Sequence, residues 1–216
     1  MSEIKNYIKD FEKALLQINR IRIEEIINQV KEQFQPIQII YDLISPALQN
    51  IGKKWEKGAV ALAQIYMAAR ICEDILDKLT LFEEIKKKDH PKIAIANFED
   101  HHVFGKKIVK MFLQNSGYDI IDYGAGITSE DLLKKVKDDT IELLFLSTLM
   151  LHSALRIKNF VDKVKEAKLN TKIIVGGAPF SFDPELWKAV GADAYGQNPS
   201  DVLHYVSEYM GGELNE

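Results

Sequence analysis

Hydrophobic residues recur every three to four positions up to about residue 85, which is the spacing of amphipathic helices. Four stripes follow one another: Ile4, Tyr7, Ile8, Phe11, Leu15 and Ile18; Ile23, Ile26, Ile27 and Val30; Ile39, Leu43, Leu48 and Ile51; and Leu62, Ile65, Ala69, Cys72, Leu76 and Leu79. Pro46 lies inside the third stripe and is expected to bend that helix. The polar face of the fourth helix is expected to carry Arg70, Glu73, Asp77 and Lys78. Four helices with short connections predict a small antiparallel bundle.

The pattern changes after a polar segment that ends at Pro91, where we place a linker. Short apolar strands then alternate with amphipathic helices. We expect strands at 93–96, 118–123, 143–147, 172–175 and 192–195, and helices that end at about Asn115 and Leu169 or start at Ser129, Asp183 and Ser200. The fold class is therefore α/β, with a four-helix bundle cap at residues 1–88 and a flavodoxin-like (Rossmann-like) domain at residues 89–216. Its five-stranded parallel sheet should have the order 2-1-3-4-5 and helices on both faces.

Composition narrows the class of protein. The 216 residues suit two modest domains, and 28 basic against 32 acidic residues give a net charge of -4, so we expect neither a nucleic acid nor a membrane as partner. The single cysteine, Cys72, excludes an intramolecular disulfide and fits a reducing compartment. No basic start precedes an apolar leader, and no apolar run approaches about 18 residues, so a cytoplasmic location is expected.

Unusual residues stand at three of the predicted strand ends. The motif Asp100-x-His102-x-x-Gly105 follows the first strand, Ser147-Thr148-Leu149 ends the third, and Gly176-Gly177 ends the fourth. In the order 2-1-3-4-5 these three strands are neighbours, so the three sets converge at the point where the strand order reverses. This convergence predicts one ligand that contacts all three.

His102 is the candidate metal ligand at this point of the sheet. A neutral imidazole binds a metal through one nitrogen while a carboxylate holds its other N–H, and Asp100 has the separation needed to supply that carboxylate. A histidine that merely caps the following helix would look the same in the sequence. The neighbouring His101 is an equal candidate to point inward, so the pair alone leaves both alternatives open.

Other sites are less well supported by the residues. A zinc site would have to use His90, His101, His102 and His152, which follow no ligand spacing of zinc modules. Cys72 has no histidine near it in sequence and is better explained as a buried filler than as a nucleophile. Gly124-Ala125-Gly126 lacks both the G-x-G-x-x-G continuation and a Walker lysine. Gly176-Gly177 either lets a bulky group pass close to the sheet or forms an ordinary turn.

Taken together, these motifs resemble the cobalamin-binding corrinoid proteins of methyltransferase systems, which share a two-domain module with cobalamin-dependent methionine synthase. The resemblance covers nearly the whole chain: a helical cap, a linker and an α/β domain with Asp-x-His-x-x-Gly, Ser-x-Leu and Gly-Gly in that order. The match over residues 100–109 is close and selects His102 rather than His101.

The resemblance implies a cobalamin or related corrinoid bound base-off, with His102 as lower axial ligand of the cobalt and Asp100 tuning it. It further implies that Ser147 bonds the buried base, that Leu149 packs beside it and that Gly176 and Gly177 leave room for the nucleotide tail. The implied cofactor-binding set is Asp100, His102, Val103, Phe104, Gly105, Ser147, Leu149, Ser153, Gly176, Gly177 and, in the cap, Trp55. The chain departs from the family pattern at Glu99, Leu151 and Ala61, where relatives often have glycine, threonine and an aromatic residue.

The function that this resemblance implies is methyl carriage, not catalysis by the chain itself, so no catalytic residue is assigned. A substrate-specific methyltransferase would load the corrinoid and an acceptor methyltransferase would unload it, with a reductive activase as a further partner. The methyl donor stays open among methanol, methylamines, betaines and aryl methyl ethers.

Two other classes of protein are alternatives to a methyl carrier. A cobalamin-dependent sensor would bind the same cofactor, but light-sensing relatives carry a Glu-His pair in the cap where this chain has Ile65-Tyr66. A receiver-like signalling module would bind no corrinoid, and the first and third strand ends lack the receiver's acidic cluster and phosphoacceptor arrangement.

Overall fold

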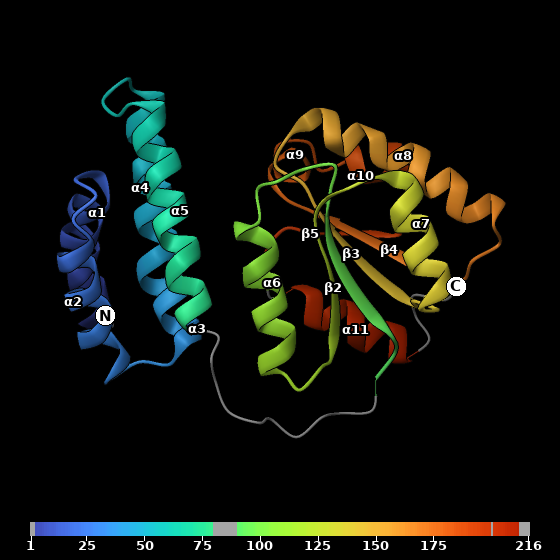
Figure 1. Ribbon diagram of the computed structural model, residues 1–216, viewed down its shortest axis with the longest axis horizontal. Helices are drawn as coiled ribbons and strands as arrows, with labels where there is room; N and C mark the ends of the chain where they lie inside the picture. The colour runs from blue at the N-terminus through green and yellow to red at the C-terminus, as the bar shows by residue number, and fades with distance from the viewer. Residues whose placement is uncertain (1–2, 80–89, 200, 212–216) are drawn as a thin grey trace. The chain divides into compact units, whose positions relative to one another are not determined.

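Helices build the first of two structural units, residues 1–82 (Figure 1). The computed structural model describes residues 3–79, 90–199 and 201–211. A 3₁₀ turn precedes the first helix, and the helices in chain order are α1 (Ile8–Leu16), α2 (Arg20–Lys31), α3 (Pro36–Ile39), α4 (Ser45–Glu56) and α5 (Leu62–Leu79). The predicted boundary between residues 88 and 89 lies in 80–89, outside the described residues, and stays a prediction. Within the described ranges, no helix combines the length and the apolar character needed to cross a bilayer.

The helix type changes just before Pro46, where a bend was expected. Residues Ile40–Ile44 form a π-helical turn between α3 and α4, and Pro46 lies in the first turn of α4. Proline has no N–H to donate to the preceding turn, so the regular α-helical hydrogen bonds are interrupted there. α3, the π-helical turn and α4 therefore take the place of the third predicted helix.

Helix α5 buries most of its predicted apolar face but differs from the prediction at Leu62 and Glu73. Its buried apolar side chains are Ala68, Ile71, Cys72, Ile75, Leu76 and Leu79. Leu62 stands six residues before Ala68, about 240° around the helix, and is 66% exposed, so its predicted place on the buried face is wrong. Glu73, predicted on the polar face, is buried and its charge is paired with Arg70 at 2.5 Å. Cys72 is fully buried as expected, and burial raises the pKa of its thiol.

The second unit, residues 83–216, contains a five-stranded sheet whose strands are all parallel (Figure 1). The strands are β1 (Ile93–Phe98), β2 (Ile120–Ile127), β3 (Leu143–Ser147), β4 (Lys172–Gly176) and β5 (Ala194–Gly196). Their order is β2-β1-β3-β4-β5, so the predicted flavodoxin-like order is confirmed. Parallel neighbours need crossover connections, and the helices between the strands provide them.

Helices cover both faces of this sheet, because strand residues alternate between two apolar clusters. The helices are α6 (Phe104–Asn115), α7 (Ser129–Asp138), α8 (Leu151–Glu166), α9 (Ala178–Phe182), α10 (Leu186–Val190) and α11 (Asp201–Gly211). In β1, Ala94, Ala96 and Phe98 pack with residues of α7, α8 and α10. Ile93 and Ile95 pack on the other face with residues of α6 and α11.

The segment after β4 differs from the prediction of one helix starting at Asp183. Two short helices, α9 and α10, stand there instead. Asp183 is extended, with φ -125° and ψ 93°, because the following Pro184 disfavours helical geometry in the residue before it. The break keeps α9 short, immediately after the glycine pair.

The register of the sheet brings the three candidate strand ends to one level. Asn97 of β1 is paired with Ser147 of β3, and Ser147 is paired with Gly176 of β4. The loops that follow these strands therefore start side by side. This is the convergence that the strand order predicted.

Candidate functional site

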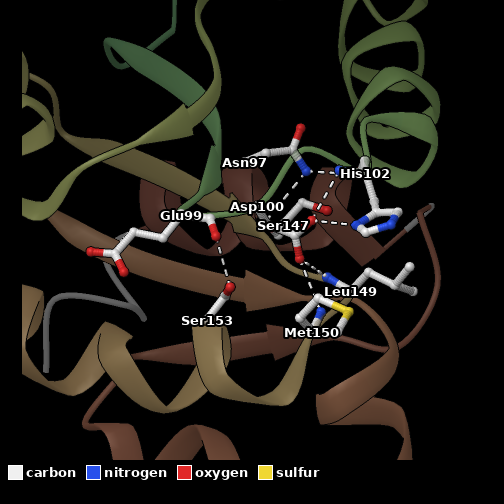
Figure 2. A network of polar contacts seen from close by, with 8 residues as sticks. All are labelled: Asn97, Glu99, Asp100, His102, Ser147, Leu149, Met150 and Ser153. Atoms are coloured by element: carbon white, nitrogen blue, oxygen red, sulfur yellow. Dashed lines mark hydrogen bonds and ion pairs between the residues drawn. The ribbon is translucent and has the colours of Figure 1, made fainter.

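The loop between β1 and α6 holds Asp100 and His102 against each other (Figure 2). Asp100 Oδ1 lies 2.6 Å from Nδ1 of His102 and also accepts the backbone N–H of His102 at 2.9 Å. The Asp100 side chain is fully buried, whereas the His102 side chain is 50% exposed. The carboxylate is thus fixed inside the protein and the imidazole reaches out from it.

The second oxygen of Asp100 bonds to the loop after β3. Oδ2 accepts the backbone N–H groups of Leu149 at 2.7 Å and Met150 at 2.9 Å. Burial alone would raise the pKa of Asp100, but these donors, together with the backbone and ring N–H groups of His102, outweigh burial and lower the pKa from 3.8 to about 2. Asp100 is therefore a carboxylate over the whole neutral range.

An ionised carboxylate only accepts hydrogen bonds, so Nδ1 of His102 carries a proton and donates a hydrogen bond to Asp100. In the neutral ring the lone pair is then on Nε2, which is the form of imidazole that binds a metal. Among the described residues, no group of three or more His, Cys, Asp or Glu side chains is placed to hold a metal ion. A metal bound by His102 would therefore take its remaining ligands from outside the described His, Cys, Asp and Glu side chains.

His101 is separated from this pair. Its ring lies against Gly126 of β2, since a Cβ built on Gly126 would stand 2.2 Å from Cε1 of His101. The backbone N–H of Gly126 in turn donates to the carbonyl of Asp100 at 2.8 Å. Of the two adjacent histidines, only His102 faces the buried carboxylate.

A cavity of about 230 Å³ opens between the ends of β1, β3 and β4. Its walls are mainly apolar side chains and small residues, among them Gly105, Ser147, Gly176 and Gly177. Gly177 has φ +112°, and a Cβ there would lie 1.9 Å from the carbonyl oxygen of Thr148, so no larger residue fits without moving the backbone. The cavity suits an apolar group that lies against this end of the sheet.

The other predicted site residues take several positions. Val103 is the N-cap of α6 and Phe104 is the first residue of that helix, and both are half-buried. The Leu149 side chain is 47% exposed, and its N–H bonds Asp100 as described above. Ser153 is fully buried, and its hydroxyl donates to the carbonyl of Glu99 at 2.8 Å. Trp55 is 47% exposed on α4 of the helical unit, and its assignment to the cofactor stays a prediction.

The departures from the family pattern are placed as follows. Glu99 has φ +46°, in the left-handed region where glycine is preferred, and its carboxylate forms an ion pair with Arg156 at 2.7 Å. Figure 2 shows this carboxylate pointing away from His102. Leu151 starts α8 and is 57% exposed, and Ala61 is exposed in the helical unit. The extra charge of Glu99 is thus neutralised outside the Asp100–His102 pair.

Sequence reasoning missed Asn97, whose side chain is fully buried under this loop. Its amide nitrogen donates to the carbonyl of His102 at 3.0 Å and to that of Ser147 at 3.4 Å. The available signal was a single amide in the otherwise apolar run of β1. The backbone donors from Leu149 and Met150 gave no signal, because any residue supplies a backbone N–H.

Known proteins resemble this chain in sequence and in fold. A family model described as B12 binding domain matches residues 91–203, and a second with the same description matches residues 7–80. The chain is 25% identical over 222 residues to dimethylamine corrinoid protein 3 of Methanosarcina acetivorans, covering 97% of this chain and 100% of the relative. It is 27% identical over 212 residues to the trimethylamine corrinoid protein of Methanosarcina barkeri, covering 94% and 93%. The solved structure of the Methanosarcina barkeri monomethylamine corrinoid protein superposes with a TM-score of 0.82 at 26% identity, covering 93% of this chain and 97% of that chain.

Proposed function

The chain belongs to the B12-binding domain family, and from this premise we propose that it is a methyl-carrying corrinoid protein with His102 as the lower axial ligand of cobalt. The observation that carries the proposal is the 2.6 Å contact between Asp100 and Nδ1 of His102, which leaves Nε2 available to a metal. The cofactor is a cobalamin or a related corrinoid. The binding mode is base-off and His-on.

The described residues fit such a cofactor at both ends of the site. At the axial end, one neutral imidazole on a buried carboxylate offers a single nitrogen ligand, which is what a macrocycle that fills the other positions requires. At the other end, the apolar cavity beside Gly105 and Ser147 offers room for the displaced nucleotide tail. A hydroxyl at Ser147 provides a polar contact for the buried base.

The roles of the residues follow from their bonds. Asp100 accepts the Nδ1–H of His102 and thereby selects the tautomer of the neutral ring whose lone pair is on Nε2. The backbone N–H groups of Leu149 and Met150 stabilise the ionised form of Asp100. When bound, the corrinoid supplies the cobalt that accepts and releases the methyl group. The chain supplies binding, orientation and access, and no nucleophile of its own.

The names of the relatives narrow the donor. The dimethylamine, trimethylamine and monomethylamine corrinoid proteins named above point to methylamines as the donor class for this chain. We assign a substrate-specific methyltransferase as the loading partner and an acceptor methyltransferase as the unloading partner, with a reductive activase as a further one. The cytoplasm is the location that this assignment requires.

The test of cofactor and ligation starts from purified protein mixed with hydroxocobalamin and desalted. We expect retained corrinoid absorbance and, after reduction to the cobalt(II) form of protein that carries ¹⁵N-labelled histidine, an electron paramagnetic resonance spectrum split into doublets by one histidine nitrogen; the cofactor's own base would give triplets from ¹⁴N. His102→Ala should lose the doublet splitting. His101→Ala is the matched control and should keep it, because His101 packs on Gly126 and not on Asp100. Doublet splitting that survives in His102→Ala, or triplet splitting in the labelled wild type, contradicts the ligation.

The test of methyl carriage uses the reconstituted, reduced protein and a methylamine methyltransferase. Supplied in turn with mono-, di- and trimethylamine, the mixture should give methylated, protein-bound cobalamin with at least one of the three amines. Free cobalamin at the same concentration is the control. Equal rates with free and protein-bound cobalamin contradict a carrier role.

A further inference from the structure

Asn97 occupies an apolar position of the sheet with a polar side chain. It lies one residue before the end of β1, is fully buried, and alternates onto the face of Ile93 and Ile95, which is covered by α6 and α11. The pairing of β1 with β2 is irregular on both sides of Asn97. The amide therefore stands where the regular ladder ends and the loop of His102 begins.

Each of its two amide hydrogens has a backbone carbonyl to bond. One carbonyl belongs to His102 and the other to Ser147, whose side chain lines the cavity. Figure 2 shows the nitrogen of Asn97 turned toward these groups and the oxygen turned to the opposite side. One nitrogen thus connects the axial-ligand loop with the strand that borders the tail cavity.

Stability alone does not account for an amide at this position. Oδ1 of Asn97 is buried and has no hydrogen-bond partner among the described residues. A buried polar atom without a partner costs free energy, and a leucine of similar size would avoid that cost. What leucine would lose is the donor to the carbonyl of His102.

The backbone of His102 is held at both of its polar groups. Its N–H donates to Asp100 Oδ1 at 2.9 Å, and its carbonyl accepts from Asn97 at 3.0 Å. Fixing both peptide groups around one Cα fixes the direction in which the side chain leaves the backbone. Asp100 additionally sets the ring tautomer, whereas Asn97 contacts only the backbone.

We infer that Asn97 is a positioning residue for the axial ligand, which holds the carbonyl of His102 so that the imidazole keeps its place relative to the tail cavity. This inference rests on the proposed corrinoid function. It assigns to Asn97 an effect on ligation that is separate from the affinity contributed by the cavity itself.

The test compares Asn97→Leu and Asn97→Ala with the wild type after reconstitution with hydroxocobalamin. Leucine removes the donor at similar volume, and alanine removes it without adding bulk or charge, so the second variant covers the case that the first does not fold. We expect both to bind hydroxocobalamin about tenfold more weakly, since a carbonyl in the ligand loop loses its bond. The cobalt(II) spectrum should show nitrogen splitting in only part of the sample.

Thr171→Val is the matched control. Thr171 is buried, and its hydroxyl donates to a backbone carbonyl, that of Ile141, at 2.7 Å, before β4 begins. Thr171→Val should lower the unfolding temperature without changing the cobalt(II) spectrum or the dissociation constant for hydroxocobalamin. Circular dichroism establishes that each variant is folded.

The outcomes separate the two proposals. Full nitrogen splitting and wild-type affinity in a folded Asn97 variant overturn the role of Asn97 and leave the corrinoid function intact. A wild type without nitrogen splitting overturns ligation by His102 and the inference with it. A loss of splitting in Thr171→Val equal to that in Asn97→Leu shows a general effect of stability and also overturns the inference.

Discussion

Asp100 accepts the backbone N–H of Leu149 at 2.7 Å, so the carboxylate beside His102 is also bonded to the loop after β3. Two loops that are far apart in the sequence share one buried charge. Because backbone donors from both loops stabilise the ionised form, the loop geometry and the charge of Asp100 depend on each other. The affinity for a metal at His102 is therefore sensitive to Asp100 although Asp100 is not itself a ligand.

Replacing Asp100 by asparagine should weaken hydroxocobalamin binding. The amide offers one acceptor oxygen where the carboxylate has two, and it places an NH₂ group against N–H donors. We expect the dissociation constant to rise by about 10- to 100-fold in an absorbance titration. Asp193→Asn is the control, since Asp193 also accepts a backbone N–H, that of Ile173 at 2.8 Å, next to β5. Equal affinities for Asp100→Asn and wild type would contradict the role of Asp100.

The protein without corrinoid should lose stability in acid through Asp100. Its pKa is lowered from 3.8 to about 2 in the folded state, so its contribution is present above 3.8 and is lost as the pH falls toward 2. The difference corresponds to about 2 kcal/mol of unfolding free energy. Urea unfolding at pH values across this window measures it. In Asp100→Asn the decline should be smaller by about that amount, and an identical decline in both proteins would refute it.

Substitutions at Glu99 separate the effect of its backbone conformation on stability from the effect of its ion pair. Its φ of +46° disfavours any residue with a Cβ, whereas its ion pair with the exposed Arg156 contributes little. Glu99→Gly should therefore be more stable than Glu99→Ala by about 1 kcal/mol, because only glycine relieves the backbone. Thermal unfolding of the two variants gives the comparison. Arg156→Ala should change the unfolding free energy by less than about 0.5 kcal/mol.

The two glycines after β4 should respond differently to alanine. At Gly177 the new methyl group would meet the carbonyl of Thr148 at 1.9 Å, and we expect a loss of about 2 kcal/mol or more in unfolding free energy. At Gly176 the nearest atom, the carbonyl oxygen of Gly196, is 3.4 Å away, so stability should change little. Gly176 borders the cavity, however, so the methyl group added in Gly176→Ala should weaken hydroxocobalamin binding. Similar unfolding temperatures for both variants would contradict this distinction.

Much of the fold follows from periodicity. The alternation of apolar strands and amphipathic helices predicted five parallel strands, and a flavodoxin-like arrangement predicted their order, which the sheet confirms. The pairing of Asn97 with Ser147 and of Ser147 with Gly176 shows the three strand ends side by side. The convergence of the strand ends needed no knowledge of side-chain conformation. The spacing of Asp100 and His102 made them candidates for a pair, but it left His101 open, and the family resemblance was needed to select His102.

Other features depend on tertiary contacts that the pattern does not encode. The exposure of Leu62 and the burial of Glu73 on α5 depend on which neighbours pack against each part of the helix, and the buried Glu73 is paired with Arg70 on the same helix. Backbone N–H groups, such as that of Met150, are the same in every sequence and become ligands of Asp100 only through folding. Asn97 could be noticed in β1, but its two acceptors come from segments 5 and 50 residues away.

Cys72 gives the helical unit a built-in reporter. It is the chain's single cysteine and is fully buried on α5, and burial raises the pKa of its thiol, so reagents meet it only when α5 separates from its neighbours. The rate at which a thiol label attaches to the unmodified protein therefore measures the opening equilibrium of the bundle. Adding corrinoid or a methyltransferase to the same labelling reaction would show how strongly each one couples to that opening, with no engineered probe.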